Sequence, residues 1–230
     1  MHTMTRPAPH PPTALLTPRA PLHLAVLGAS GRSGRHLVEQ ALAAGHAVRV
    51  LVRDPQKLGP LAGRVAVVQG DATDPTALAA LVANTDVVLS VLGAVKGSPD
   101  NLFTRSTRGL VGAMQASGVS RLIVLGGAGV RVSQDPRTLG GRLAALATSL
   151  MIPRQVRDAH EQLSMLETSD LDWTVVRAPQ LTQGPASGQF QVGYLPRPAL
   201  ARISRADVAA ALLSQLADPR WRRQAPVVLA

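Results

Sequence analysis

Two hydrophobic patterns alternate along the chain from residue 22 onward. Short runs of apolar and β-branched residues are found at 22–27, 47–52, 65–69, 87–92, 121–125 and 173–177. Runs of this length and composition are typical of strands buried on both faces. Between them, apolar residues recur at helical spacing at 34–44, 76–82, 101–117 and, over a longer stretch, 143–168. The alternation predicts a parallel sheet with helices packed on both of its faces.

Turn and capping residues agree with this prediction. Asp54-Pro55 and Asp74-Pro75 each place an N-cap aspartate before a proline suited to the first helical position. Gly45 and Gly118 follow predicted helices, where a left-handed cap is common. Because crossovers between parallel strands are right-handed, these elements predict an α/β, doubly wound (Rossmann-like) fold.

The last fifty residues predict a small C-terminal lobe on the substrate side. It begins after Pro179 and contains a short strand at 189–194 and a final strand at 227–229. Ser204 and Asp207 have the spacing of a capping box, so we expect the last helix to begin there.

A glycine-rich turn follows the first strand. It consists of Gly28, Ala29, Ser30, Gly31, Arg32, Ser33 and Gly34. Gly28 permits the tight turn, Gly31 the approach of a diphosphate, and Gly34 the close packing of helix on sheet. The helix N-terminus then offers unpaired N–H groups to phosphate. The context predicts a dinucleotide site, and a strand–helix turn without a ligand is the alternative.

The end of the second strand indicates which dinucleotide binds. NAD enzymes usually carry an acid there, which binds the ribose hydroxyls. This strand ends in Arg53 instead, with Lys57 one helical turn later and Arg32 inside the glycine turn. Three cations near the expected 2′-position favour NADP(H) over NAD(H).

The ends of the later strands predict further cofactor contacts. Asp71 is expected beside the adenine, where it either accepts from the adenine amino group or holds its own turn. Leu92 and Gly93 follow the fourth strand and are expected along the ribose. Gly126 and Gly127 follow the fifth strand and are expected to bring backbone close to the nicotinamide half.

Composition excludes several kinds of site. The chain has 230 residues and no cysteine, which excludes disulfides, thiolate metal sites and cysteine nucleophiles. No His, Asp and Glu cluster has metal-ligand spacing, so no metal is expected. No apolar run approaches the length of about 18 residues that spans a bilayer. The net charge of +10 comes from scattered arginines, and aromatics are only 2%, so neither nucleic acid nor a membrane is an expected partner.

Residues 1–21 are rich in proline and lack the continuous apolar segment of a signal peptide. We expect a disordered tail in front of a single domain at 22–230. The protein is expected to be cytoplasmic and either a monomer or a homodimer.

Five segments carry a family resemblance: 28–34, 52–54, 70–72, 172–179 and 203–208. They resemble the atypical short-chain dehydrogenase/reductase group of NAD(P)H-binding proteins and, within it, the biliverdin-IXβ reductase/flavin reductase branch. The resemblance implies that the glycine turn meets the diphosphate and that Arg53 and Lys57 meet the 2′-phosphate. It implies the remaining contacts at Asp71 and Ala72 for the adenine, Leu92 and Gly93 for the ribose, and Gly126, Gly127, Ala178 and Pro179 for the nicotinamide.

Two departures from this branch concern the substrate. Gly126 and Gly127 stand where the branch tends to have a hydroxyl residue, and Gln180 stands where it tends to have a histidine. Both differences leave the cofactor site intact and argue against biliverdin itself.

The proton-transfer pair of most short-chain dehydrogenases is absent from the sequence. That pair is Tyr-x-x-x-Lys, whereas the only tyrosine here is Tyr194 and no lysine follows it. Hydride transfer to a flavin, quinone or tetrapyrrole-like ring requires positioning and an apolar pocket more than a protein acid. His160 is the candidate proton donor. The alternative is a solvated helix residue paired with Glu161 or Asp158.

We therefore expect an NADPH-dependent oxidoreductase that acts on a small conjugated acceptor. A non-catalytic NADP(H)-binding sensor is the alternative, because a missing acid–base pair is compatible with both. A nucleotide-sugar isomerase or dehydratase is disfavoured by the short C-terminal lobe.

Overall fold

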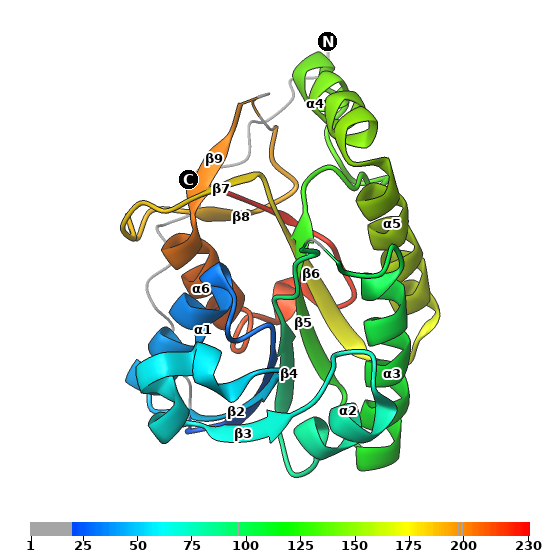
Figure 1. Cartoon of the computed structure of the whole chain (residues 1–230). Coiled ribbons are helices and arrows are strands. Elements are labelled where there is room, and N and C mark those ends of the chain that lie inside the picture. The colour runs from blue at the N-terminus through cyan, green and yellow to red at the C-terminus, as the bar shows by residue number, and fades with distance from the viewer. Residues whose placement is uncertain (1–19, 96, 197, 199) are drawn as a thin grey trace.

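The computed structural model describes residues 20–95, 97–196, 198 and 200–230, so most of the predicted tail lies outside the described residues. An eight-stranded sheet runs through the centre in the order β3-β2-β1-β4-β5-β6-β10-β8. Its strands are β1 (His23–Leu27), β2 (Ala47–Val52), β3 (Ala66–Gln69), β4 (Val87–Ser90), β5 (Arg121–Gly127), β6 (Asp172–Ala178), β8 (Gln191–Gly193) and β10 (Val227–Leu229). All neighbours are parallel except β10 and β8. The predicted doubly wound α/β fold is confirmed (Figure 1).

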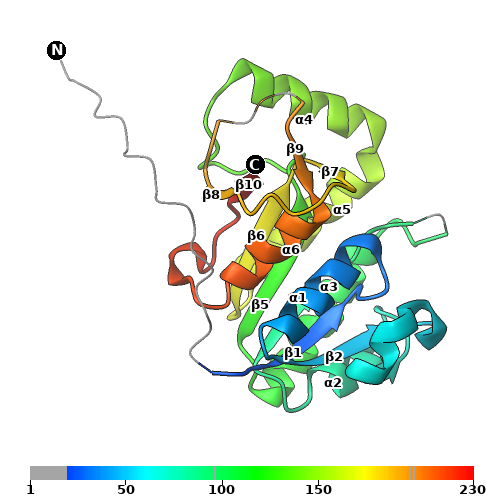
Figure 2. The same ribbon diagram turned by 90° about the vertical axis from the view of Figure 1, so that its left-hand side faces the viewer.

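Helices cover both faces of the sheet (Figure 2). One face is covered by α1 (Arg32–Ala43), α6 (Arg205–Ser214) and the 3-10 segment η1 (Pro55–Arg64). The other is covered by α2 (Pro75–Val82), α3 (Leu102–Ser117) and α5 (Pro153–Thr168). The remaining elements are α4 (Leu139–Met151), η2 (Pro219–Trp221) and a parallel pair of strands, β7 (Gln180–Thr182) and β9 (Arg202–Ser204). No helix of the described residues has the length and apolar character to cross a membrane.

Local capping follows the predicted chemistry. The side chains of Asp54 and Asp74 accept hydrogen bonds from Gln56 N at 3.0 Å and Thr76 N at 2.9 Å, which begins η1 and α2. Gly45 and Gly118 adopt φ of 85° and 70°, as expected for left-handed caps. At the start of α6, Ser204 Oγ accepts a hydrogen bond from Asp207 N at 2.9 Å.

The predicted long helix at 143–168 is divided into α4 and α5. Pro153 has no N–H to continue the helical ladder, and it occupies the first turn of α5. Ile152 before it has φ of −137°, outside the helical range. The segment α4 extends beyond the sheet (Figure 1), and its leucines Leu139, Leu143, Leu146 and Leu150 are exposed.

Two predicted strands differ from expectation because of their places in the sheet. The run at 65–69 was expected to be buried on both faces, but β3 is an edge strand and most of its side chains are exposed. The run at 189–194 forms only the three residues of β8. This strand joins the opposite edge of the main sheet, antiparallel to β10, rather than a separate lobe.

The close packing of α1 against the end of β1 depends on two glycines, Gly28 and Gly34, in and after the turn that joins them. Gly28 has φ of +82°, and a Cβ there would lie 2.7 Å from the carbonyl oxygen of Val91. A Cβ on Gly34 would collide with the carbonyl oxygen of Gly28. Because both obstacles are backbone atoms, neither can move aside without displacing β1 or β4.

We predict that Gly34→Ala lowers the free energy of unfolding by about 1–3 kcal/mol, the range typical of overpacked interiors. Urea denaturation monitored by circular dichroism measures this change. The matched control is Gly112→Ala on the exposed face of α3, where a Cβ meets nothing within 4 Å. That substitution is expected to raise stability by about 0.5–1 kcal/mol, because alanine favours helix. Equal free energies of unfolding for the two variants would contradict the claim that a Cβ at Gly34 disturbs the packing of α1 on β1.

Candidate functional site

A cleft of about 470 Å³ opens at the carboxyl ends of the parallel strands. Its walls come from the turns after the six consecutive parallel strands, together with the starts of α3 and α6 and part of β7. The strand order reverses between β1 and β4, the place where doubly wound sheets bind ligands. The size is also within the range of cofactor and ligand pockets.

The cleft brings together most of the residues predicted from the sequence. Those that line it are Gly28, Ser30, Gly31, Arg32, Ser33, Arg53, Asp71, Ala72, Leu92, Gly93, Gly126, Gly127, Ala178 and Pro179. Ala29 and Gly34 are buried behind the turn and support its shape. Lys57 and His160 are not part of the cleft wall.

The start of α1 is built to receive an anion. Gly31 is its N-cap residue, so no side chain caps the helix. Gly31 N donates to Gly28 O at 3.0 Å, which closes the tight turn. The N–H groups of the following turn therefore face the cleft with the positive end of the helix dipole. This arrangement suits the diphosphate of a dinucleotide.

Two further glycines leave space along the cleft. A Cβ on Gly93 or Gly127 would meet nothing within 4 Å, so packing does not require glycine at either position. Gly126 differs, because a Cβ there would lie 2.7 Å from Val175 Cγ1. Gly93 and Gly127 therefore widen the cleft, whereas Gly126 serves the packing of β5 against β6.

Asp71 takes the turn-holding role that the sequence left open. Its Oδ1 accepts from Thr73 N at 2.8 Å and from Thr73 Oγ1 at 2.7 Å. These bonds lower the pKa of Asp71, against a smaller effect of burial, and the charges of Arg53 and Arg105 lower it further. Asp71 Oδ2 makes no hydrogen bond with the described residues, so one oxygen remains for a ligand at this end of the cleft.

The predicted contact of Lys57 with the 2′-phosphate stays a prediction. The Lys57 side chain is exposed, and its ammonium lies 4.0 Å from the carboxylate of Asp54. The carbonyl of Lys57 accepts a hydrogen bond from the guanidinium of Arg35, which fixes η1 against α1. Lys57 is not among the residues that line the cleft.

His160 lies outside the residues that line the cleft, so its role as a proton donor stays a prediction. It is exposed on α5 and makes no hydrogen bond or ion pair with the described residues. Its neighbour Asp158 is the buried residue of this turn and accepts from Phe103 N at 2.7 Å and Thr104 N at 2.9 Å. Asp158 thereby caps α3 from another helix and holds Phe103, which lines the cleft.

Several functional features were missed by sequence reasoning. Arg205 lines the cleft, and it belongs to the segment 203–208 that carried the family resemblance. The spacing of that segment indicated the cap of α6 but not where Arg205 points. Phe103 also lines the cleft, and its isolated position in the sequence provided no signal.

A buried ion pair holds the loop after β5. Arg177, which is 1% exposed, donates to Asp135 at 2.8 and 2.5 Å and to the carbonyl oxygens of Val130 and Ala225 at 2.6 and 2.7 Å. Burial opposes ionisation of Asp135, but the bonds from Arg177 and from Val132 N outweigh it and lower the pKa of Asp135. The pair therefore ties the 128–138 loop to β6 and to the segment before β10.

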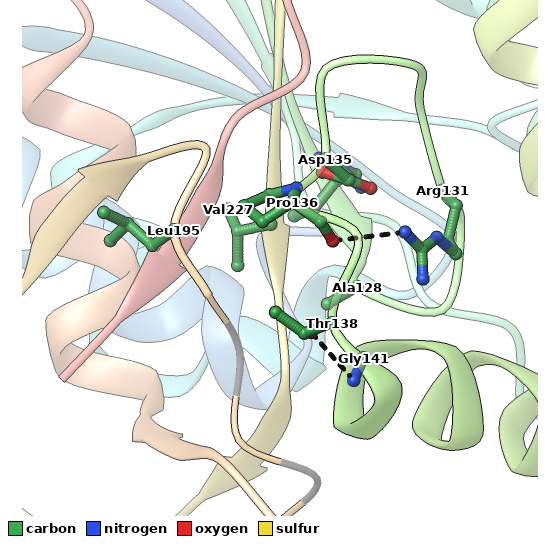
Figure 3. A pocket seen from close by; sticks show the side chains of 9 residues that line it. Ala128, Arg131, Asp135, Pro136, Thr138, Gly141, Leu195 and Val227 are labelled. Atoms are coloured by element: carbon green, nitrogen blue, oxygen red, sulfur yellow. Dashed lines mark hydrogen bonds and ion pairs between the residues drawn. The ribbon is translucent and has the colours of Figure 1, made fainter. Parts of the chain in front are cut away.

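A small hollow lies beside this pair (Figure 3). Arg131 donates to the Pro136 carbonyl at 3.4 Å, and Thr138 Oγ1 accepts from Gly141 N at 3.2 Å, which begins α4. The hollow holds about 20 Å³, enough for a water molecule but not for a substrate. It is a structural feature of the loop rather than a binding site.

The carboxylate of Asp207 fixes the part of the structure formed by the loop before β8 and the start of α6. Asp207 accepts from Ser187 N and Gly188 N, both at 2.9 Å, and from Ser204 Oγ at 2.8 Å. Burial opposes its ionisation, yet these hydrogen bonds lower the pKa of Asp207 overall. The network joins the loop before β8 to the first turn of α6 and so sets the position of Arg205.

The whole βα arrangement, from the glycine turn to η2, matches a family model described as NAD(P)H-binding at residues 28–219. The chain belongs to this NAD(P)H-binding family. The match covers every wall of the cleft and confirms the NAD(P)H-binding family that the sequence resembles.

Solved structures agree with this assignment. The chain is 25% identical to ChuY, an anaerobilin reductase from Escherichia coli O157:H7, with a TM-score of 0.75 and coverage of 90% of this chain and 96% of ChuY. A short-chain dehydrogenase/reductase from Veillonella parvula DSM 2008, solved in complex with NADP, is 21% identical with a TM-score of 0.74 and coverage of 91% and 94%. SP1627 from Streptococcus pneumoniae TIGR4, a candidate NADH-flavin reductase, is 22% identical with a TM-score of 0.71 and coverage of 90% and 99%. Because the latter two structures are only 21% and 22% identical to this chain, they support the fold alone.

We predict that Asp135→Ala lowers the free energy of unfolding by about 3–5 kcal/mol, because Arg177 would remain buried without its charge partner. Urea denaturation measures the loss. Asp100→Ala is the matched control, since Asp100 pairs with Arg154 at 2.9 Å but both side chains are more than half exposed. Exposed pairs contribute about 0–1 kcal/mol. A similar small loss for both variants would contradict the role given to the buried pair.

Proposed function

We propose that the protein is an NADPH-dependent reductase of a small conjugated acceptor such as a flavin, a quinone or a tetrapyrrole-like ring. The observation that carries this proposal is the division of the cleft into two chemically different ends. Arg32, Arg53 and the open N-terminus of α1 gather positive charge at the glycine turn. The other end, where we place the nicotinamide, includes the apolar side chains of Phe103, Leu125 and Leu181.

The apolar end suits a ring rather than an alcohol or ketone. The titratable groups among the described cleft residues are Arg32, Arg53, Asp71 and Arg205. None of them is a general acid or base suited to neutral pH at the nicotinamide end, because the arginines stay charged and Asp71 lies at the adenine end. A conjugated ring accepts hydride into a delocalised system and takes its proton from solvent, so this wall is sufficient.

Tyr194 does not supply the missing acid. Its hydroxyl accepts a hydrogen bond from Ala225 N at 3.3 Å, and its ring packs edge-on against Trp221 with centroids 5.8 Å apart. Burial raises the pKa of Tyr194, against smaller opposing effects of the Ala225 hydrogen bond and the Arg177 charge. The residue stabilises the β8 edge and lies outside the cleft wall.

The chain's own residues would act chiefly by positioning. The α1 N-terminus and Arg32 bind the diphosphate, and Arg53 binds the 2′-phosphate. Gly93 and Gly127 leave room for the ribose and nicotinamide, while Ala178 and Pro179 form the wall behind the ring. Phe103 and Leu181 offer an apolar surface to one side of the acceptor ring. Bound NADPH supplies the hydride, and solvent supplies the proton that completes the reduction.

The likeness to ChuY supports a reductase, because that protein is named as an anaerobilin reductase. The same cleft is also compatible with a non-catalytic NADP(H) sensor, since a site without an acid–base pair binds cofactor equally well. Turnover separates the two functions.

The purified protein is expected to oxidise NADPH in the presence of FMN or menadione, followed as loss of absorbance at 340 nm. Turnover with either acceptor supports the reductase. Tight NADPH binding without turnover across flavins, quinones and linear tetrapyrroles would instead establish the sensor. Absence of NADPH and NADH binding would reject both.

Arg53→Asp tests the choice of cofactor. We expect the dissociation constant for NADPH to rise at least about tenfold, because a carboxylate would replace the partner of the 2′-phosphate. The constant for NADH should change much less, and both are measured by nicotinamide fluorescence. Arg64→Asp changes net charge equally but lies at the exposed end of η1, so it should leave the NADPH to NADH ratio unchanged. Equal weakening of both cofactors by Arg53→Asp would refute the 2′-phosphate contact.

A further inference from the structure

One buried arginine in the described chain has no partner. The side chains of Arg121, Arg177 and Arg205 are each buried, with residue exposures of 8%, 1% and 8%. Arg121 donates to Thr174 Oγ1 and to the Gln215 carbonyl, both at 2.9 Å, and Arg177 pairs with Asp135. Arg205 makes no hydrogen bond or ion pair with any described residue, although its guanidinium can donate five hydrogen bonds.

The surroundings of Arg205 make its charge unfavourable in the free protein. Burial lowers its pKa, and the nearby charge of Arg32 lowers it further. Arg205 is also the first residue of α6, so it stands at the positive end of the helix dipole. A cation held at such a place without a counter-charge indicates an anionic ligand.

The location of Arg205 narrows the choice of anion. Arg53 enters the cleft from β2, on one side of β1. Arg205 enters from the opposite side, because α6 follows β9, which pairs with β7 directly after β6. The glycine turn after β1 lies between these two sides. Arg205 lines the same cleft as Arg32, and α6 packs against α1, where Gln40 Nε2 donates to the Ala206 carbonyl at 2.9 Å, so Arg205 belongs to the glycine-turn side of the cleft. Arg205 is therefore better placed to bind the diphosphate than the 2′-phosphate.

We infer that Arg205 is a second diphosphate-binding residue, which holds the dinucleotide from the neighbouring wall at the start of α6. This inference rests on the proposed cofactor site and extends it to the α6 side. The backbone N–H groups of the glycine turn and the guanidinium of Arg205 face the same anion from two directions. The Asp207 network fixes the first turn of α6, so the cation is held in place before the cofactor binds.

The diphosphate is common to NADPH and NADH, so the two cofactors should respond equally. We expect Arg205→Met, which keeps much of the side-chain volume and removes the charge, to raise both dissociation constants at least about tenfold. Arg205→Lys, which keeps a charge but not the planar fork, should fall between wild type and Arg205→Met. Nicotinamide fluorescence titrations measure both constants.

The free protein provides a readout that a merely structural role would not give. Because the unpartnered charge is unfavourable without ligand, Arg205→Met should raise the melting temperature of the free protein. The upward shift of melting temperature on adding NADPH should shrink in the same variant. Arg108→Met removes an equal charge from the exposed face of α3, outside the cleft wall, and should alter neither quantity by a comparable amount.

Three results would overturn the inference. A lower melting temperature of free Arg205→Met, with both dissociation constants within twofold of wild type, would make Arg205 a structural residue. A loss confined to NADPH would assign it to the 2′-phosphate. Unchanged cofactor binding with a raised KM for FMN but not for uncharged menadione would assign it to the phosphate of the acceptor. Each of these results leaves NADPH oxidation by the wild type intact, so failure of the inference is distinguishable from failure of the proposed function.

Discussion

The structure depends on the close approach of α1 to the end of β1. Gly28 reverses the chain with a positive φ, and Gly34 lets the helix backbone rest against the Gly28 carbonyl. This contact aims the helix N-terminus across the switch point of the sheet, where neighbouring crossovers leave the cleft. A side chain at either position would push the helix away and disperse the N–H groups that face a phosphate. The cofactor site is thus a consequence of backbone packing before any side chain contributes to it.

The walls around that centre are held by buried polar groups with complete sets of partners. Asp158 caps α3 from α5, Arg177 and Asp135 tie down the loop after β5, and Asp207 joins the loop before β8 to α6. Long loops contribute few apolar contacts, so charge-assisted bonds define their positions. Against this background the unpartnered guanidinium of Arg205 stands apart. Buried charges with partners mark the scaffold, whereas a buried charge without one marks the place of a ligand.

The chemistry of the cleft is correspondingly divided. Cations and helix N–H groups collect where the phosphates of a dinucleotide belong, and apolar residues collect where its reactive ring belongs. Among the described cleft residues there is no protein acid at the end where the nicotinamide is proposed. Acceptors that need only a hydride and a solvent proton match this division, and the family membership and the likeness to ChuY are in accord with it.

The sequence by itself determined the six consecutive parallel strands, most of the helices between them, the caps at Asp54, Asp74 and Ser204, and the glycine turn, because these depend on local periodicity and local hydrogen bonds. It did not predict the break before Pro153 or the strands β7 and β9. It also identified most of the cleft, since the ends of parallel strands meet at one edge. The tertiary structure decided what depends on the direction of single side chains. Lys57 and His160 project outside the cleft, while Arg205 and Phe103, distant in sequence, enter it. Neighbouring residues of a helix point to different sides, so a shift of one position decides whether a side chain faces the cleft or the solvent. That choice depends on how the helix packs against its neighbours, which the sequence alone does not show.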